Sequence, residues 1–99
     1  MKVVLAAVAR ATANAMAAGW AKNRPKAPGA FRRDLAAGLA RLAEHREIGE
    51  PYVTAEGRAV RRHLLRTVQC YLQYEVQANR VEVLMIWSAR RGEGPPMGS

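Results

Sequence analysis

The sequence contains a single cysteine, Cys70, among its 99 residues. One cysteine excludes an intrachain disulfide framework and a zinc site built from several thiolates. This cysteine usage is typical of a reducing compartment, so we expect a cytoplasmic protein. Cys70 falls on the apolar side of an alternating segment, which favours buried packing over a reactive thiol.

Long apolar runs are also missing, because no run reaches the ~18 residues that a membrane span needs. The stretch Val3–Ala9 is apolar, and Ala13-Asn14-Ala15 is similar to a signal-peptide cleavage site. Arg10, however, interrupts the apolar stretch, and a helical pattern continues to Trp20. We therefore expect a folded segment rather than a targeting signal, and no membrane association.

Residues that perform acid–base or nucleophilic chemistry are scarce. Histidine occurs only at His45 and His63, and serine only at Ser88 and Ser99. No group of residues has metal-ligand spacing, a Ser-His-Asp triad has almost nothing to draw on, and no glycine-rich phosphate loop precedes a helix. We expect neither a metal site nor a cofactor.

Negative charge is absent from residues 1–33, in which no aspartate or glutamate occurs. The whole chain has 16 lysines and arginines against 8 acidic residues, a formal net charge of +8. Such a balance predicts an acidic or polyanionic partner. The alternative is a solvated basic surface that keeps a small protein soluble.

The amino-terminal half predicts a strand over residues 1–6 and a helical hairpin over residues 7–45. Val3–Leu5 is β-branched or bulky, as in a strand, and the first helix should end before Pro25. The expected apolar positions of this helix are Val8, Thr12, Ala15/Met16 and Gly19/Trp20.

Pro28 is suited to the first position of the second helix. An apolar stripe follows at Phe31, Leu35, Gly38/Leu39 and Leu42, while Arg32, Arg33, Arg41 and Glu44 should face water. Gly38 and Gly19 are expected to let the two helices approach closely.

The period changes to two after Gly57, which predicts a β-meander over residues 57–91 followed by a tail over 92–99. Its strands are Val60–Leu65, Val68–Val76 and a central Val81–Trp87, with turns near Arg66-Thr67 and at Gln77–Arg80, where Asn79 suits a positive φ. We expect one α+β domain over 1–99 with the order β-α-α-β-β-β, the helical hairpin packing on an antiparallel sheet.

Arginines and aromatic residues of this meander are the candidate binding site. Guanidinium groups beside aromatic rings suit contact with phosphates, bases or the carboxylates of an acidic peptide. The candidates are Arg58, Arg61, Arg62, Arg66, Tyr71, Trp87, Arg90 and Arg91.

The chain resembles RelE/ParE-type toxins of bacterial type II toxin–antitoxin systems. The resemblance lies in the runs Val60–Thr67, Tyr71–Val76, Val81–Trp87 and Arg90-Arg91, preceded by Trp20–Pro28 and Ile48–Tyr52 as a helix-hairpin link and a pre-strand loop. It covers nearly the whole chain in order. It implies a toxin of this family, neutralised by an antitoxin whose acidic amphipathic tail folds on it in a hetero-oligomer.

Two activities occur in this family, and the resemblance leaves both open. RelE-like members are ribosome-dependent mRNA endoribonucleases, whereas ParE-like members inhibit DNA gyrase by binding. Tyr71 and Leu64 stand where the ribonucleases have basic residues, and the tail has no tyrosine or histidine for proton transfer. Arg62 and Arg91 match basic positions, but arginine stays protonated. We therefore expect a non-enzymatic, ParE-like gyrase inhibitor, with the ribonuclease as the alternative and an inactive basic module as a third hypothesis.

Overall fold

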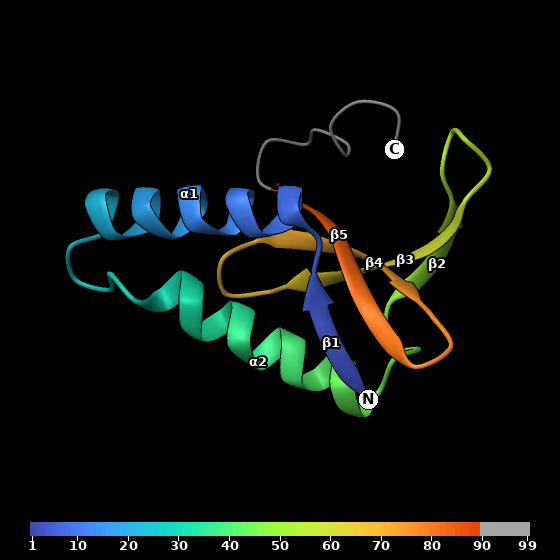
Figure 1. Ribbon diagram of the computed structural model, residues 1–99. Helices are drawn as coiled ribbons and strands as arrows, with labels where there is room; N and C mark the ends of the chain where they lie inside the picture. Colours follow the sequence, from blue (N-terminus) through green and yellow to red (C-terminus); the bar gives the residue numbers. More distant parts are fainter. Residues whose placement is uncertain (90–99) are drawn as a thin grey trace.

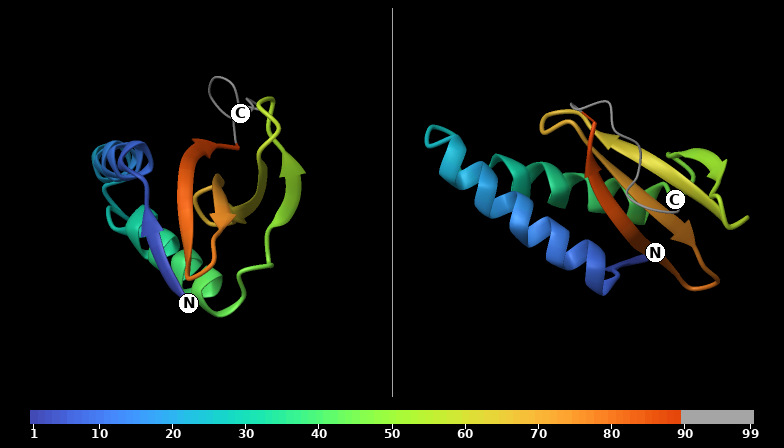
Figure 2. Two further views of the ribbon diagram at one scale, coloured as in Figure 1. Left: turned by 45° about the vertical axis from the view of Figure 1, so that its right-hand side comes forward. Right: turned by 90° about the horizontal axis from the view of Figure 1, so that it is seen from above.

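Two helices cover one face of a five-stranded sheet in the computed structural model, which describes residues 1–89 (Figure 1). The elements are β1 (Lys2–Leu5), α1 (Ala7–Asn23), α2 (Ala30–Glu44), β2 (Glu50–Val53), β3 (Ala59–Leu65), β4 (Cys70–Val76) and β5 (Arg80–Ser88). Both helices lie on the same side of the sheet in the left panel of Figure 2. The predicted α+β class, with a helical hairpin on a sheet, is confirmed.

The sheet is mixed, which corrects the prediction of an entirely antiparallel one. The strand order is β1-β5-β4-β3-β2, and β1 pairs with β5 in parallel while the other neighbours are antiparallel. β1 is followed by the helical hairpin instead of a tight turn, so its neighbour need not run the opposite way. The prediction that the last strand lies inside the sheet is confirmed.

An additional strand, β2, occupies part of the segment that the sequence predicts to be a loop. β2 pairs with the first half of β3, and Thr54 N donates to Arg58 O to close the hairpin between them. Along an antiparallel ladder, pairs that exchange backbone hydrogen bonds alternate with pairs that exchange none. Counted from the hydrogen-bonded pair Thr54–Arg58, the pair Pro51–Arg61 is one that exchanges none. The missing N–H of Pro51 therefore costs this edge strand nothing.

The stripe predicted for the second helix is confirmed, since Phe31, Leu35, Gly38 and Leu42 of α2 are buried. In α1 the prediction is one residue out of phase. Val8 is 56% exposed, and the buried positions are Ala9, Ala13 and Ala17, with Met16 and Trp20 packed beside them. A helix made largely of alanine has little contrast between its faces, so the sequence pattern does not fix which face is buried.

The glycine prediction is wrong. A Cβ at Gly38 would lie 2.4 Å from Leu65 Cδ2 and 3.7 Å from Leu72 Cδ1, so Gly38 lets α2 approach the sheet rather than α1. Gly19 has nothing within 4 Å of its Cβ position and mediates no close approach.

Several element boundaries also differ from the prediction. α1 ends before Pro25 as expected, but α2 begins at Ala30, because Pro28 and the N-cap residue Gly29 still belong to the turn. β4 begins at Cys70, after a turn in which Gln69 takes a φ of 55°. Gln69, and not Asn79, is the residue other than glycine with positive φ within residues 1–89.

Candidate functional site

The sheet face opposite the helices carries most of the polar and aromatic side chains of the strands. Alternation sends Leu72 and Tyr74 of β4 into the core beneath the helices, so Tyr71 and Gln73 point to the other side. Cross-strand partners share a face, which extends this surface over four strands. We call it the open sheet face; its residues are Glu50, Tyr52, Val60, Arg62, Leu64, Tyr71, Gln73, Glu75, Glu82 and Trp87.

A row of rings and one guanidinium group crosses the middle of the open sheet face. The Arg62 guanidinium carbon lies 5.6 Å from the ring centroid of Tyr52 and 5.0 Å from that of Tyr71. The Tyr71 ring in turn lies 5.5 Å from Trp87, tilted by 32°. Cation–π and tilted aromatic contacts of this kind hold the flat groups in place. Trp87 is only 6% exposed, so the part of the row that can contact planar or anionic groups is formed by Tyr52, Arg62 and Tyr71.

Polar partners fix the end of this row formed by Tyr52 and Arg62. Tyr52 Oη donates to Gln73 Oε1, and Gln73 is only 3% exposed. Arg62 Nη2 pairs with Glu50 Oε1 at 2.8 Å. Burial raises the pKa of the Tyr52 hydroxyl, although the positive charge of Arg62 acts in the opposite direction. The phenol of Tyr52 therefore stays protonated at neutral pH.

A second ion pair lies toward the β2–β3 hairpin. Arg58 Nε and Nη2 donate to the two carboxylate oxygens of Glu75 at 2.7 and 2.9 Å. These hydrogen bonds, with one from Gln77, lower the pKa of Glu75 to about 2. Arg58 is thus engaged in a bidentate pair that ties the hairpin to β4.

Replacement of Glu75 by glutamine is expected to remove a pH-dependent contribution to stability. The native pKa lies below the ordinary value of 4.5, so the contribution is present above pH 4.5 and is lost as the pH falls toward 2. Because Arg58 is half exposed, we expect only about 1 kcal/mol at pH 7. Urea unfolding of both proteins from pH 7 to pH 2 measures it. Glu47→Gln keeps the Arg58–Glu75 pair and is the control, so its free energy of unfolding should change with pH as that of the wild type does. Equal pH profiles of Glu75→Gln and the wild type would contradict the assignment.

Only part of the predicted set meets on this face. Arg62, Tyr71 and Trp87 form the row, and Arg66 is exposed in the β3–β4 turn, where it lines a pocket of about 230 Å³ together with Arg62 and Tyr71. Arg61 points to the helix side, where its Nη1 donates to Glu47 O and Gly49 O. Arg61 therefore holds the loop before β2. The predicted candidates Arg90 and Arg91 lie outside the described residues.

Tyr52 and Glu50 join the site without having been predicted. Both belong to β2, in which Pro51 lies between them. A proline argues against a strand, so this segment was not predicted to be one. The usable signal was the spacing of two between Glu50 and Tyr52 after the helical half had ended. The burial of Gln73 as the acceptor for Tyr52 became evident only from the structure.

One edge of β3 is left without a partner strand. β2 ends at the pair Glu50–Arg62, so β3 continues past it through residues 63–65. Every second residue of β3, counted from Arg58, turns its backbone N–H and C=O toward β2. Leu64 continues this series beyond the end of β2, so its N–H and C=O point to the unpaired side. A groove of about 530 Å³ runs beside the edge, lined by Asp34, Arg41, Ile48, His63, Leu64, Arg66 and Thr67.

His63 and Arg41 meet in this groove, which corrects the prediction that Arg41 faces water. Arg41 is half-buried, and its Nε donates to His63 Nε2 at 3.3 Å. Burial, assisted by the charges of Arg41 and Arg66, lowers the pKa of His63. The imidazole is therefore neutral at pH 7, carries its proton on Nδ1, and has its Nε2 lone pair occupied by Arg41.

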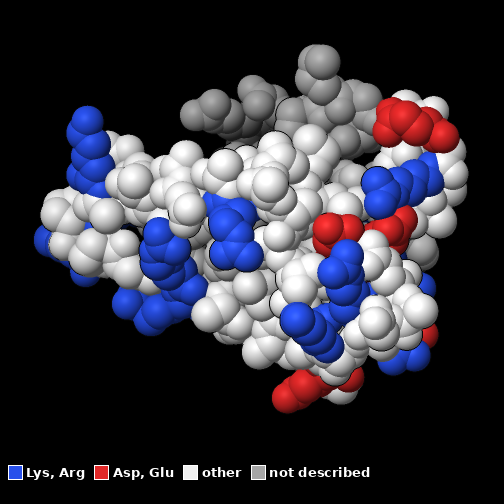
Figure 3. Space-filling view, viewed as in Figure 1, with Lys and Arg blue, Asp and Glu red and all other residues white. Residues whose placement is uncertain are grey.

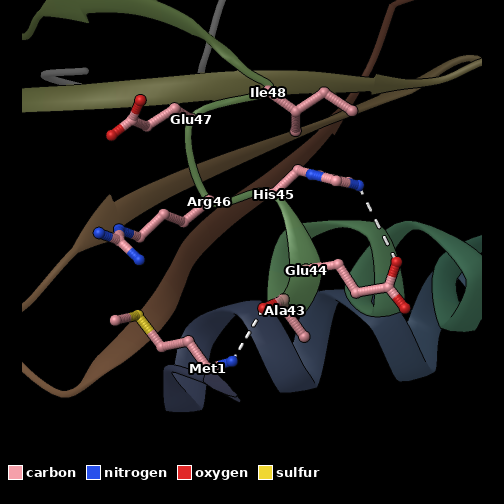
Figure 4. A pocket seen from close by; sticks show the side chains of 7 residues that line it. All are labelled: Met1, Ala43, Glu44, His45, Arg46, Glu47 and Ile48. Carbon is pink, nitrogen blue, oxygen red and sulfur yellow. Dashed lines mark hydrogen bonds and ion pairs between the residues drawn. The ribbon is translucent and has the colours of Figure 1, made fainter.

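A further pocket of about 710 Å³ opens between the carboxyl end of α2 and the loop to β2 (Figure 4). The Met1 ammonium donates to Ala43 O at 2.8 Å, and His45 lies 3.9 Å from the exposed carboxylate of Glu44. Within residues 1–89 no group of three or more His, Cys, Asp or Glu residues is arranged to hold a metal ion. Nor is any helix in that range both long and apolar enough to cross a membrane.

Two helices on one face of a mixed sheet in the order β1-β5-β4-β3-β2 define the RelE/ParE-like α+β fold that the resemblance implied. A chain of the solved structure "Chromosomal ParDE TA system from P. aeruginosa" has this fold: its TM-score is 0.69 at 17% identity, over 87% of this chain and 92% of that chain. No protein-family model and no curated protein matches the sequence. At this identity the likeness establishes the fold.

Proposed function

We propose that the chain is the toxin of a type II toxin–antitoxin module and acts in the cytoplasm as a ParE-like inhibitor that binds DNA gyrase. The observation that carries the proposal is the shared fold with a chain of a ParDE system, a toxin–antitoxin assembly by its title. The open sheet face supports a binding role, because its central row combines Arg62 with the half-buried rings of Tyr52 and Tyr71. Arginine and large aromatic residues dominate the energetics of protein interfaces.

The chemistry of the open sheet face favours binding over RNA cleavage. A ribonuclease needs groups that exchange protons near neutral pH. An arginine side chain does not exchange its proton near neutral pH. The pKa of Tyr52 is raised, and the pKa of Glu75 is about 2. His63 projects to the helix side of β3, and its Nε2 is bound to Arg41. The described part of this face therefore offers anion and ring contacts without a matched acid and base.

The unpaired edge of β3 is our proposed contact for the antitoxin. An extended segment added there would pair with the N–H and C=O of Leu64 and lay its side chains in the groove beside β3. Arg41 and Arg66 line that groove with one carboxylate, Asp34, and Arg62 lines the adjoining pocket with Glu50, its ion-pair partner. Arginines outnumber carboxylates in this lining, so acidic side chains fit it. The proposed partner is accordingly a cognate antitoxin with an acidic tail, in a hetero-oligomer.

Leu64→Pro is expected to weaken antitoxin binding about tenfold or more. Proline removes the outward N–H and blocks a docked strand, and the lost backbone pairing corresponds to about 1.4 kcal/mol. The ladder with β4 loses no donor, because this N–H points away from it. Calorimetric titration with a cognate antitoxin measures the Kd. Leu64→Val, the control, should bind normally; wild-type affinity of Leu64→Pro would contradict docking at this edge.

A supercoiling assay tests the proposed target. Purified protein at micromolar concentration, incubated with gyrase and relaxed or supercoiled plasmid, should abolish supercoiling or trap cleaved DNA. If gyrase works at its normal rate and mRNA on translating ribosomes shows codon-phased cuts, the alternative holds, and the protein is a ribosome-dependent endoribonuclease. Expression of the chain alone with no growth arrest would favour an inactive basic module over both.

A further inference from the structure

The end of the helical hairpin at which α1 and α2 meet is strongly and uniformly basic. Within the twelve residues from 22 to 33 the chain has five cations and no carboxylate. We call this surface the basic tip; its residues are Lys22, Arg24, Lys26, Arg32 and Arg33. It supplies five positive charges in a protein whose net charge is +8, so most of the excess is concentrated here.

No acidic side chain among residues 1–89 forms an ion pair with the basic tip. The ion pairs between described residues involve His45, Arg58 and Arg62, and none of the five cations of the tip. In Figure 3 the end formed by the helix hairpin shows blue side chains without red ones, and the red side chains lie on the other half of the molecule. The amino end of α2 lies at the same place and has no acidic residue in its first turn.

The composition of the basic tip distinguishes among polyanionic partners. The core of a protein interface is usually apolar, and helices that lie stably on a membrane surface insert apolar side chains beside their basic ones. The exposed large apolar residues of the described chain are Met1, Val8, Ile48, Val53 and Val76, none of them at the tip. A nucleic-acid interface, by contrast, is polar and strongly positive.

The same surface favours a duplex over a single strand. Single strands are bound by stacking their bases on aromatic rings. Trp20 is the aromatic residue next to the tip, and the Arg24 guanidinium carbon lies 3.8 Å from its ring centroid. The ring is thus covered by a cation that itself faces outward. We infer that the basic tip binds the phosphate backbone of a nucleic-acid duplex without reading its sequence; this inference does not depend on the proposed function.

Fluorescence anisotropy with a labelled 20-bp DNA of arbitrary sequence tests the inference on the protein alone. Five phosphate contacts predict that log K falls with log[salt] with a slope of about −4.5. The variant Lys22→Ser/Lys26→Ser/Arg32→Ser should lower affinity at least tenfold at low salt and reduce the slope by about 3. Thermal unfolding of each variant shows whether the fold is retained, and an RNA duplex of the same sequence distinguishes DNA from duplexes in general.

A variant with the same net charge separates the basic tip from overall charge. Lys2→Ser/Arg10→Ser/Arg46→Ser removes three exposed cations elsewhere and should keep the affinity within about twofold. Equal loss in the two variants would overturn the inference, because binding would then follow total charge. Absence of DNA binding by the wild type would also overturn the inference. Displacement of the DNA by polyglutamate at equal charge concentration would overturn it too, because the basic tip would then bind acidic polypeptides as well as it binds a duplex.

Discussion

Replacing Gly49 with alanine is expected to lower the free energy of unfolding by about 3 kcal/mol. A Cβ at this buried position would lie 2.7 Å from Arg62 O, from Tyr74 Cε1 and from Tyr74 Oη. One of these atoms is backbone and the tyrosine is fully buried, so neither can move cheaply. Overpacking of this kind costs about 1–3 kcal/mol. Displacing the tyrosine also breaks the hydrogen bond from Gly49 N to its hydroxyl, worth about 1 kcal/mol.

Gly19→Ala is the matched control, because nothing lies within 4 Å of its Cβ position in α1. Alanine in a helix interior is favoured over glycine by about 1 kcal/mol, so this variant should be more stable than the wild type. Urea unfolding measured side by side gives both values. A Gly49→Ala protein within about 1 kcal/mol of the wild type would show that the loop before β2 adjusts freely.

Arg62→Ala should raise the concentration needed to inhibit gyrase about 30-fold or more. Arginines at the centre of an interface cost about 2 kcal/mol or more when truncated, which corresponds to this factor. Arg62 holds that place between the Tyr52 and Tyr71 rings. Its ion pair with Glu50 is largely exposed, so stability should change by less than about 1 kcal/mol. The supercoiling assay and a thermal melt together separate loss of target binding from loss of fold.

Two further variants sharpen this test. Arg62→Lys keeps the charge but loses the planar group that lies against the rings, so we expect an intermediate loss. Arg10→Ala removes an exposed cation of α1 and should leave inhibition unchanged. Full inhibition by Arg62→Ala would exclude the open sheet face as the gyrase contact while leaving the toxin proposal in place; a wild-type protein without effect on gyrase would remove the target itself.

The parts of the fold that could be predicted are those with strong contrast between faces. The stripe of Phe31, Leu35 and Leu42 stands out against arginines, and its burial follows from spacing. The alanines of α1 offer no such contrast, and the prediction of its buried face was wrong by one residue. β2 was not predicted because a proline argues against a strand. Pro51 is tolerated only because its partner in the ladder, Arg61, accepts no hydrogen bond from it, and this pairing is known only from the structure.

The candidate site was predictable only as a list of residue types. Arg61 and Arg62 are neighbours in sequence, yet one supports a loop on the helix side and the other lies between two tyrosine rings. A strand turns successive residues to opposite faces, so the distinction depends on register, which is set by pairing with β2 and β4. Tyr52 entered the site through that same pairing.

The parallel pairing of β1 with β5 joins residues 2–5 to residues 80–83. A nascent chain leaving the ribosome therefore has no partner for its first strand until almost nine-tenths of the described sequence has been made. The buried face of α1 packs mainly against β5, so it stays without its partner during that interval. Pairings between distant segments are slow to form, so we expect the molecule to fold after its synthesis rather than during it.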